Sequence, residues 1–171
     1  ITSMGWGTGD GGLAGQAVEI YGSTHVAGWR FVAPNNFVSI GQYRAMMFLR
    51  ASYVNMHNLR FEGESLLFTG DGLIVSNLAL TNRTGEPAVS LKVRGDNERF
   101  ADLNLARATM EVFGTSNQVE RMRQRWGETE LTGTNVTVMN AVVMTTNASR
   151  TGIVVNAAYA VVSNCTVMSR R

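Results

Sequence analysis

Apolar and polar residues recur along the chain in a fixed frame around seven bend positions, which we call anchors. Two residues before each anchor, one residue after it and three residues after it, the side chain is apolar, with Gln124 as the exception. Successive anchors lie 30, 19, 25, 19, 19 and 24 residues apart, a period typical of solenoid proteins. The anchors are Gly28, Asn58, Asn77, Asp102, Arg121, Asn140 and Asn164.

A second set of apolar positions lies about ten residues upstream of each anchor and alternates with outward residues, which is the period of a β-strand. Four glycines stand seven positions before an anchor, where we expect a turn. The pattern therefore predicts an all-β solenoid. The glycines are Gly70, Gly95, Gly114 and Gly133. The inward pairs are Met47/Leu49, Leu66/Phe68, Leu91/Val93, Met110/Val112, Thr129/Leu131 and Ile153/Val155, with Val18/Ile20 displaced by one in the first unit.

The apolar pattern changes phase at each anchor, so the chain must bend there. Asn tolerates the left-handed backbone conformation that a sharp bend needs, and its amide forms local hydrogen bonds. When layers stack about 4.8 Å apart, such amides can also bond along the stack and satisfy buried polar groups. We therefore predict a structural ladder. Its members are Asn58, Asn77, Asp102, Asn140 and Asn164.

With this ladder and phrases such as VSNCTV (162–167), the chain resembles the pectate-lyase-like superfamily of right-handed parallel β-helices, which includes phage tailspikes. The resemblance implies a single-stranded right-handed parallel β-helix of about seven coils. We expect this domain over residues 18–171, after a Gly-rich lead-in or first irregular coil at 1–17. A left-handed helix is the main alternative, but no six-residue period appears; a helical repeat fits the strand alternation less well.

Composition narrows the class of partner. The 171 residues are 44% hydrophobic and only 16% charged, which favours a protein that buries surface against other subunits. The net charge of +2 is too small to predict a nucleic-acid partner, and no apolar run reaches the roughly 18 residues that membrane insertion needs. Cys165 occupies an inward position, so we expect a buried, unreactive thiol. The two histidines lack the spacing of metal ligands, so no metal or cofactor is expected.

Glu111 and Glu130 are the candidate catalytic pair. They lie one unit apart in the same outward column, which would place their Cβ atoms roughly 5 Å apart. Two carboxylates near that separation suit a retaining glycosidase, with one as acid/base and the other as nucleophile. The favoured alternative is that Lys92 and Arg94, one coil earlier, neutralise a solvated polar face.

Candidate glycan-binding residues are Arg94, Arg123 and Trp126. Arg123 shares an outward column with Arg30 and Arg60, a stripe suited to an acidic polysaccharide or to another subunit's carboxylates, although a plain solvent-facing column is more common. The fifth unit is irregular because Arg121 replaces a ladder residue and Gln124 a core residue, and such departures mark functional or interface sites. Trp126 suits sugar stacking, a subunit interface or a half-buried turn.

Three functions remain open. The low charge and the outward apolar residues late in the chain favour a structural or attachment module of a phage or virus surface protein, such as a tailspike, fibre or capsid decoration. It would be a homotrimer or bind other virion subunits, and the resemblance implies recognition of a host polysaccharide. The second function is a polysaccharide depolymerase, a glycosidase or lyase, that uses the glutamate pair. The third is an autotransporter-type bacterial adhesin. All three place the protein on a virion surface or outside the cell.

Overall fold

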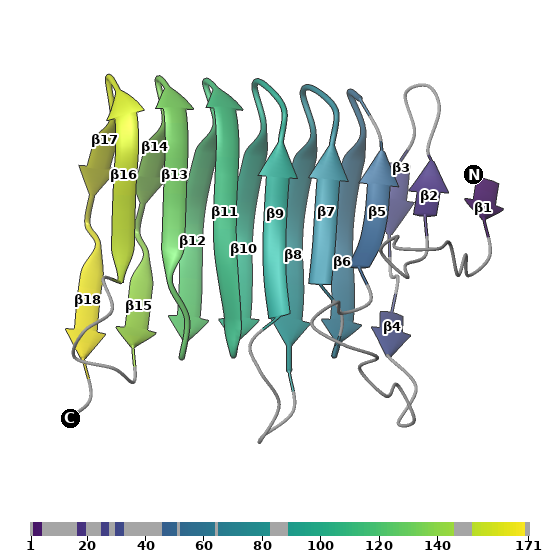
Figure 1. Cartoon of the computed structure of the whole chain (residues 1–171), viewed down its shortest axis with the longest axis horizontal. Helices are drawn as coiled ribbons and strands as arrows, with labels where there is room; N and C mark the ends of the chain where they lie inside the picture. The colour runs from purple at the N-terminus through teal and green to yellow at the C-terminus, as the bar shows by residue number, and fades with distance from the viewer. Residues whose placement is uncertain are drawn as a thin grey trace, which may run out of the picture.

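The computed structural model describes residues 2–4, 17–19, 25–27, 30–32, 46–50, 52–63, 65–82, 89–145 and 152–169. These residues form β-strands and turns without a helix, arranged in two sheets that face each other (Figure 1). The 8-stranded sheet has the order β1-β2-β5-β7-β9-β11-β13-β16. The 10-stranded sheet runs β17-β14-β12-β10-β8-β6-β3, with β15, β18 and β4 beside this path.

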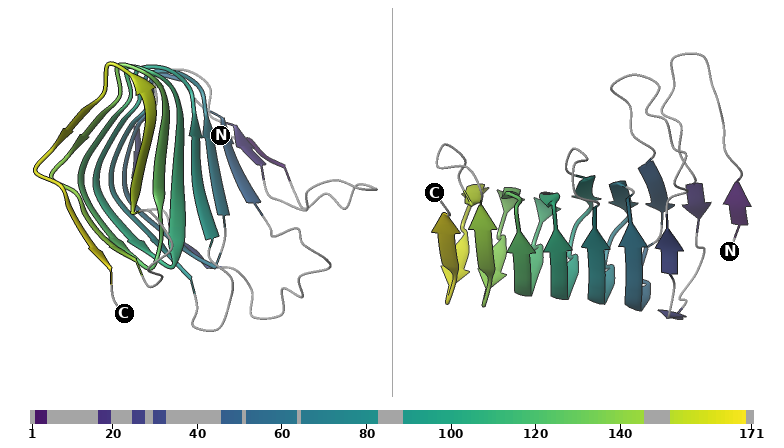
Figure 2. Two further views of the ribbon diagram at one scale, coloured as in Figure 1. Left: turned by 60° about the vertical axis from the view of Figure 1, so that its left-hand side comes forward. Right: turned by 90° about the horizontal axis from the view of Figure 1, so that it is seen from below.

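From β5 onward the chain alternates between the two sheets, so neighbours within a sheet are one repeat apart and pair in parallel (Figure 2). The prediction of an all-β fold of stacked parallel sheets is confirmed, and the arrangement is consistent with a parallel β-helix. The 8-stranded sheet comprises β1 (Thr2–Met4), β2 (Ala17–Glu19), β5 (Met46–Arg50), β7 (Ser65–Thr69), β9 (Val89–Arg94), β11 (Ala108–Thr115), β13 (Thr129–Thr134) and β16 (Ile153–Ala158). The 10-stranded sheet comprises β3 (His25–Ala27), β4 (Arg30–Val32), β6 (Asn55–Glu62), β8 (Ile74–Thr81), β10 (Arg99–Ala106), β12 (Gln118–Arg125), β14 (Thr137–Met139), β15 (Val142–Thr145), β17 (Val161–Ser163) and β18 (Thr166–Ser169).

The core lies between the sheets and consists of columns of apolar side chains. Each column runs through successive layers in register, as where Leu103 pairs with Leu78 on one side and Met122 on the other. Phe68 and Phe100 meet across the core in an edge-to-face contact, with ring centroids 5.8 Å apart. Burial of one such side chain contributes about 1.5–3 kcal/mol. The columns around the anchors are buried at Met56, Leu59, Phe61, Val75, Leu78, Leu80, Phe100, Leu103, Leu105, Val119, Met122, Val138, Ala141 and Val143.

The described anchors all adopt the left-handed backbone conformation, with φ between 50° and 57°. Gly28 lies outside the described residues. The anchor side chains are exposed, so the expectation that the ladder satisfies buried polar groups is wrong. The reason is geometric: the residues two before and one after an anchor both point inward, which leaves the anchor on the outside of the bend. We call this edge of the stack the anchor corner.

The turn from the 8-stranded to the 10-stranded sheet has its left-handed residue five positions before each anchor. Its predicted place at the glycines is confirmed at Gly70 and Gly95, which lie in the bends directly after β7 and β9, and is wrong at Gly114 and Gly133. Left-handed residues form this first corner. Gly114 and Gly133 instead lie within β11 and β13, where backbones stack closely: a Cβ on Gly133 would stand 1.8 Å from the Gly114 carbonyl oxygen. The first-corner residues are Tyr53, Gly72, Asn97, Ser116, Asn135 and Tyr159.

The last described layer departs from the predicted burial. Val162 and Val167 continue inward columns but are 49% and 50% exposed, and Cys165 is half-buried rather than buried. The cause is their position at the sheet edge, because β17 and β18 pair with β14 and β15 on one side only. The exposure of these residues is therefore an effect of their place at the edge of the described layers.

The first layer is described only in short strands. Val18 pairs with Leu49, so it continues the second position of the inward pair, whereas Ile20 lies outside the described residues. The strand β1 pairs antiparallel with β2. Most of the predicted lead-in at residues 1–17 lies outside the described residues, so this domain boundary stays a prediction.

Candidate functional site

The two candidate catalytic glutamates stand side by side on the outer face of the 8-stranded sheet. Glu111 on β11 and Glu130 on β13 are direct partners in the parallel register, and both are half-buried. Lys92 is the partner of Glu111 on β9, and its Nζ lies 3.0 Å from Glu111 Oε2. Glu130 Oε1 accepts a hydrogen bond of 3.2 Å from Asn156 Nδ2. Each carboxylate is thus engaged by a different neighbour.

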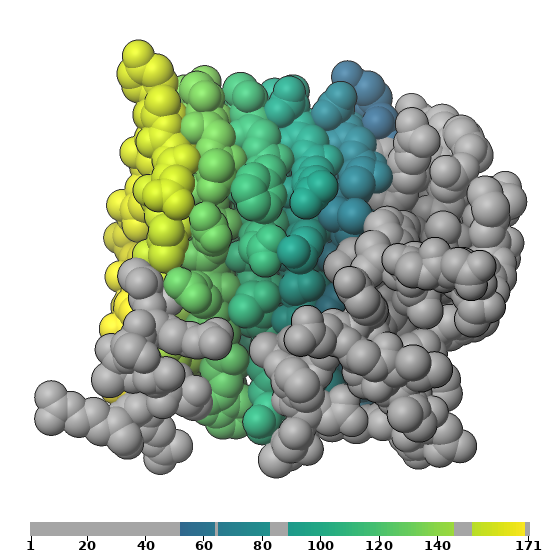
Figure 3. Space-filling view, in the orientation of Figure 1, coloured from purple at the N-terminus to yellow at the C-terminus, as the bar shows by residue number. Residues whose placement is uncertain are grey.

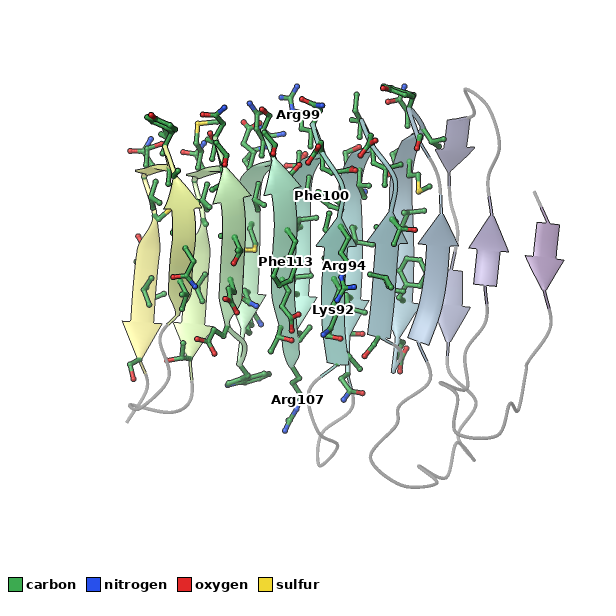
Figure 4. All side chains as sticks on the ribbon, turned by 45° about the horizontal axis from the view of Figure 1, so that its top comes forward. Lys92, Arg94, Arg99, Phe100, Arg107 and Phe113 are labelled. Carbon is green, nitrogen blue, oxygen red and sulfur yellow. The ribbon has the colours of Figure 1, made fainter. Side chains whose placement is uncertain are left out.

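The surface around this pair is a ridged sheet face. In the space-filling view the side chains of successive strands form adjoining vertical bands across it (Figure 3). Figure 4 shows Lys92 and Arg94 on β9, with Phe113 of the next strand beside Arg94. The Arg94 guanidinium carbon lies 5.9 Å from the centroid of the Phe113 ring, so the cation packs on an aromatic face. Lys92 therefore neutralises Glu111, whereas Arg94 packs on an aromatic ring and takes part in no ion pair among the described residues.

The structure separates the three candidate glycan-binding residues into two groups. Arg94 extends from the 8-stranded sheet, whereas Arg123 lies on β12 of the 10-stranded sheet and Trp126 directly follows that strand. Arg94 therefore faces a different side of the molecule. The Arg60 and Arg123 positions do share a column, but Ala79 and Asn104 intervene, so no continuous stripe of arginine forms.

A shallow groove of about 470 Å³ runs along the outer face of the 10-stranded sheet at the anchor corner. Within the described part of the chain, the Arg123 guanidinium beside it forms no ion pair and is exposed. Asn104 and Asn140 add exposed amides, so the groove offers one uncompensated cation among hydrogen-bonding groups. The groove is lined by Asp102, Leu103, Asn104, Arg121, Met122, Arg123, Asn140 and Val142.

Charge in this groove is partly cancelled at the anchors. Arg121 Nε donates to Asp102 Oδ1 at 2.7 Å, and Nη2 donates to Oδ2 at 3.0 Å. The hydrogen bond from Arg121 lowers the pKa of the Asp102 carboxyl below its ordinary value. Arg121 also contacts Glu120, whose other oxygen accepts from Arg99. Arg121 therefore forms ion pairs with neighbouring acidic residues, whereas Arg123 forms none among the described residues.

Trp126 begins the third corner, where the chain returns to the 8-stranded sheet. It has φ 60°, its side chain is 44% exposed, and the Arg107 guanidinium carbon lies 5.7 Å from its ring centroid. Figure 4 shows Arg107 at the opposite edge of the stack from Arg99. The Arg107 guanidinium therefore packs against one face of the exposed indole.

A buried polar pair fixes the turn that carries Trp126. Gln124 is 1% exposed, and its Nε2 donates to the carbonyl oxygens of Ala108 at 2.8 Å and Glu128 at 3.0 Å. Its Oε1 accepts a 2.7 Å hydrogen bond from the Thr129 hydroxyl, which is also fully buried. The polar atoms of Gln124 are therefore satisfied within the core, although the residue stands in an apolar column. Its hydrogen bond to Ala108 ties the turn to the preceding layer.

Sequence reasoning missed several residues of these surfaces. Arg125 is exposed two positions after Arg123 on the same outward face, and no described residue forms an ion pair with it. Counting every second residue along β12 would have identified it. Glu98 and Asn117 lie four positions before their anchors, and both are buried. The apolar frame of the sequence included only the positions two before, one after and three after each anchor.

The part of the chain that the structure describes holds no group of three or more His, Cys, Asp or Glu arranged to bind a metal ion. No described helix is long and apolar enough to cross a bilayer. Comparisons with protein-family models, with curated proteins and with solved structures find no match to this chain.

Proposed function

We propose that this chain is a structural attachment module of a virion or cell surface, built as a right-handed parallel β-helix of about seven coils. The observation that carries the proposal is the set of outward apolar side chains on the 10-stranded sheet late in the chain. Val142 and Met144 on β15 are half-buried, and Met168, the partner of Met144 on β18, is 42% exposed. Exposed apolar patches on a protein surface favour association. We propose that other copies of the chain cover this face in a homotrimer.

A variant pair tests this assembly. Met168→Asp places a charge on this outward apolar face, and we expect it to convert the trimer into a monomer when mass is measured by light scattering. Ile74→Asp is the matched control, because Ile74 is 46% exposed but lies at the start of β8, far from β18 in the strand order. Loss of the trimer in both variants, or in neither, contradicts an interface at this face.

The module's proposed ligand is an acidic polysaccharide, and the uncompensated charge of Arg123 and Arg125 favours it. A guanidinium binds a carboxylate through two parallel hydrogen bonds, and an exposed indole such as Trp126 packs on the apolar face of a sugar ring. Asn104 and Asn140 beside the groove suit sugar hydroxyls. This combination selects an anionic glycan over a neutral one.

Polygalacturonate and dextran are suitable anionic and neutral probes of this surface. We expect polygalacturonate to bind and to weaken as salt rises, because exposed charges are screened. The Arg123→Ala/Arg125→Ala variant should lose at least about tenfold in affinity, since hydrogen bonds to charged groups contribute about 1.5–3 kcal/mol each. Arg94→Ala, on the other sheet, is the control. Equal binding of dextran, or an equal loss in the control, contradicts this site.

The depolymerase alternative has less support, because Lys92 neutralises Glu111 and Asn156 holds Glu130. We expect Glu111→Gln and Glu130→Gln to leave both glycan binding and polymer length unchanged. Cleavage of a polysaccharide by the parent chain, abolished in both variants, would favour the enzyme instead. An autotransporter-type adhesin would be a monomer without cleavage.

A further inference from the structure

Glu98 is a carboxyl group enclosed in the core beside the first corner. It lies in the bend between β9 and β10, and its side chain is 1% exposed. In adjacent layers the same column holds Leu73 and Asn117, both fully buried. Val54 and Val136 extend the column and are also buried, so an acidic residue here replaces an apolar one.

The hydrogen bonds of Glu98 leave one oxygen unsatisfied. Oε2 accepts the Leu73 N–H at 3.0 Å, whereas Oε1 is buried with no partner among the described residues. Asn117 secures the backbone around it: Oδ1 accepts the Glu98 N–H, and Nδ2 donates to the Gly95 carbonyl oxygen, both at 2.9 Å. The turn is thus closely held, but a negative charge on Oε1 would have no donor.

The charged groups that face Glu98 also disfavour its ionised form. Asp71, in the bend of the preceding layer, and Asp96, in its own bend, are both acidic. Arg99 follows Glu98 directly, but its guanidinium pairs with Glu120. No described ion pair includes Glu98. Burial, followed by repulsion from the two aspartates, raises the pKa of Glu98 to about 8, although the Leu73 N–H acts in the opposite direction.

We propose that Glu98 is a proton-dependent latch that joins two layers of the stack at the first corner. As a neutral carboxylic acid it accepts the Leu73 N–H and packs in the apolar column. When it loses its proton to solvent, the charge must be hydrated, and the bends that contain Leu73 and Glu98 separate to admit water. The latch therefore makes the stack less stable in neutral and mildly alkaline solution.

The direction of the pH effect follows from the raised pKa. The unfolded chain releases the Glu98 proton near its ordinary pKa of 4.5, and the folded chain retains it up to about 8. Between these values the folded state binds more protons, so its stability is greatest at the acidic end and falls as pH rises. One retained proton corresponds to a fall of up to about tenfold in the folding equilibrium constant per pH unit across this window.

The test compares the parent chain with Glu98→Gln in denaturant unfolding from pH 5 to pH 8. The glutamine amide keeps the shape and an acceptor for the Leu73 N–H but does not ionise. We expect the folding equilibrium constant of the parent chain to fall with pH relative to that of Glu98→Gln. Glu111→Gln is the control, since its half-buried carboxylate pairs with Lys92, and its curve should follow the parent chain. Parallel curves for the parent and Glu98→Gln would overturn the latch.

A second measurement needs no variant, and it tests the latch even if Glu98→Gln does not fold. Carbon-13 NMR of the side-chain carboxyl in the parent chain reports its titration directly. We expect a midpoint near 8, together with a lower protection factor of the Leu73 N–H above that pH, after correction for base-catalysed exchange. A midpoint near 4.5, or a protection factor of the Leu73 N–H that does not change with carboxyl ionisation, overturns the proposal.

Discussion

Arg121 on β12 binds Asp102 on β10 side-on, through hydrogen bonds of 2.7 Å and 3.0 Å between neighbouring layers. The other described anchors pair amide with amide: Asn77 Nδ2 donates to Asn58 Oδ1 at 2.7 Å, and Asn164 Nδ2 donates to Asn140 Oδ1 at 3.3 Å. Arg121 and Asp102 each stand where the other described anchors have an amide. Their ion pair takes the place of the amide–amide hydrogen bond.

This ion pair predicts a stability effect in acid. Because Arg121 lowers the pKa of Asp102, its contribution to stability is present above the ordinary value of 3.8 and is lost as pH falls through the lower, folded value. Arg121→Gln should return the Asp102 titration toward the ordinary value, as measured by carbon-13 NMR. Arg99→Gln, which removes a different partner of Glu120, should leave it unchanged. An unaltered Asp102 titration in Arg121→Gln would show that the side-on pair does not form in solution.

The glycines inside the strands predict a second effect. Gly133 has φ 142°, and a Cβ there would stand 1.8 Å from the Gly114 carbonyl oxygen, so Gly133→Ala combines backbone strain with a clash. We expect a loss of about 2–4 kcal/mol in the free energy of unfolding. Gly152→Ala should cost less, because the added methyl would meet the side chain of the exposed Val167. Similar costs for the two variants in urea unfolding would contradict close backbone stacking at Gly133.

One core column supplies a matched pair of valines. Val119 and Val162 both stand two positions before an anchor, but Val119 is fully buried and Val162 is 49% exposed. In dilute solution Val119→Ala should lower the free energy of unfolding by about 2–3 kcal/mol, and Val162→Ala by less than about 1 kcal/mol. Equal costs for the two variants in urea unfolding would contradict this difference in burial.

The buried pair of Gln124 and Thr129 predicts non-additive behaviour. Gln124→Leu restores the apolar column but leaves the Thr129 hydroxyl without its 2.7 Å partner, so it should cost about 1–3 kcal/mol in free energy of unfolding. Combining Gln124→Leu with Thr129→Val removes the hydroxyl that has lost this partner, and should recover part of the lost free energy of unfolding. The coupling energy follows from a double-mutant cycle in urea. Additive effects would show that the two side chains do not interact.

The sequence was sufficient for the strands and the core columns because burial repeats with the chain. Phe100 and Val119 occupy equivalent positions 19 residues apart, and both are buried as predicted. The turn was misplaced at two glycines, Gly114 and Gly133, because they mark close backbone approach, whereas the left-handed residue of the turn is as variable as Ser116 and Asn135. A left-handed bend has no single residue signature, so pattern alone did not locate it.

The surfaces were less predictable because the repeat does not show which outward residues lie on the same side of the molecule. Arg94 and Arg123 were placed in one candidate site, yet they belong to different sheets. The favoured alternative for the acidic pair is confirmed at Glu111, which Lys92 of the preceding coil neutralises, because the repeat places both residues in one column. Glu98 was missed because its column lies in the turn, outside the strand alternation that guided the prediction.

The most direct test of the central claim is the mass of the parent chain in solution, measured by light scattering after size exclusion over a range of protein concentrations. The outward apolar side chains of β15 and β18 predict a stable trimer, which dissociates only on dilution. A monomer at every concentration would contradict the assembling attachment module.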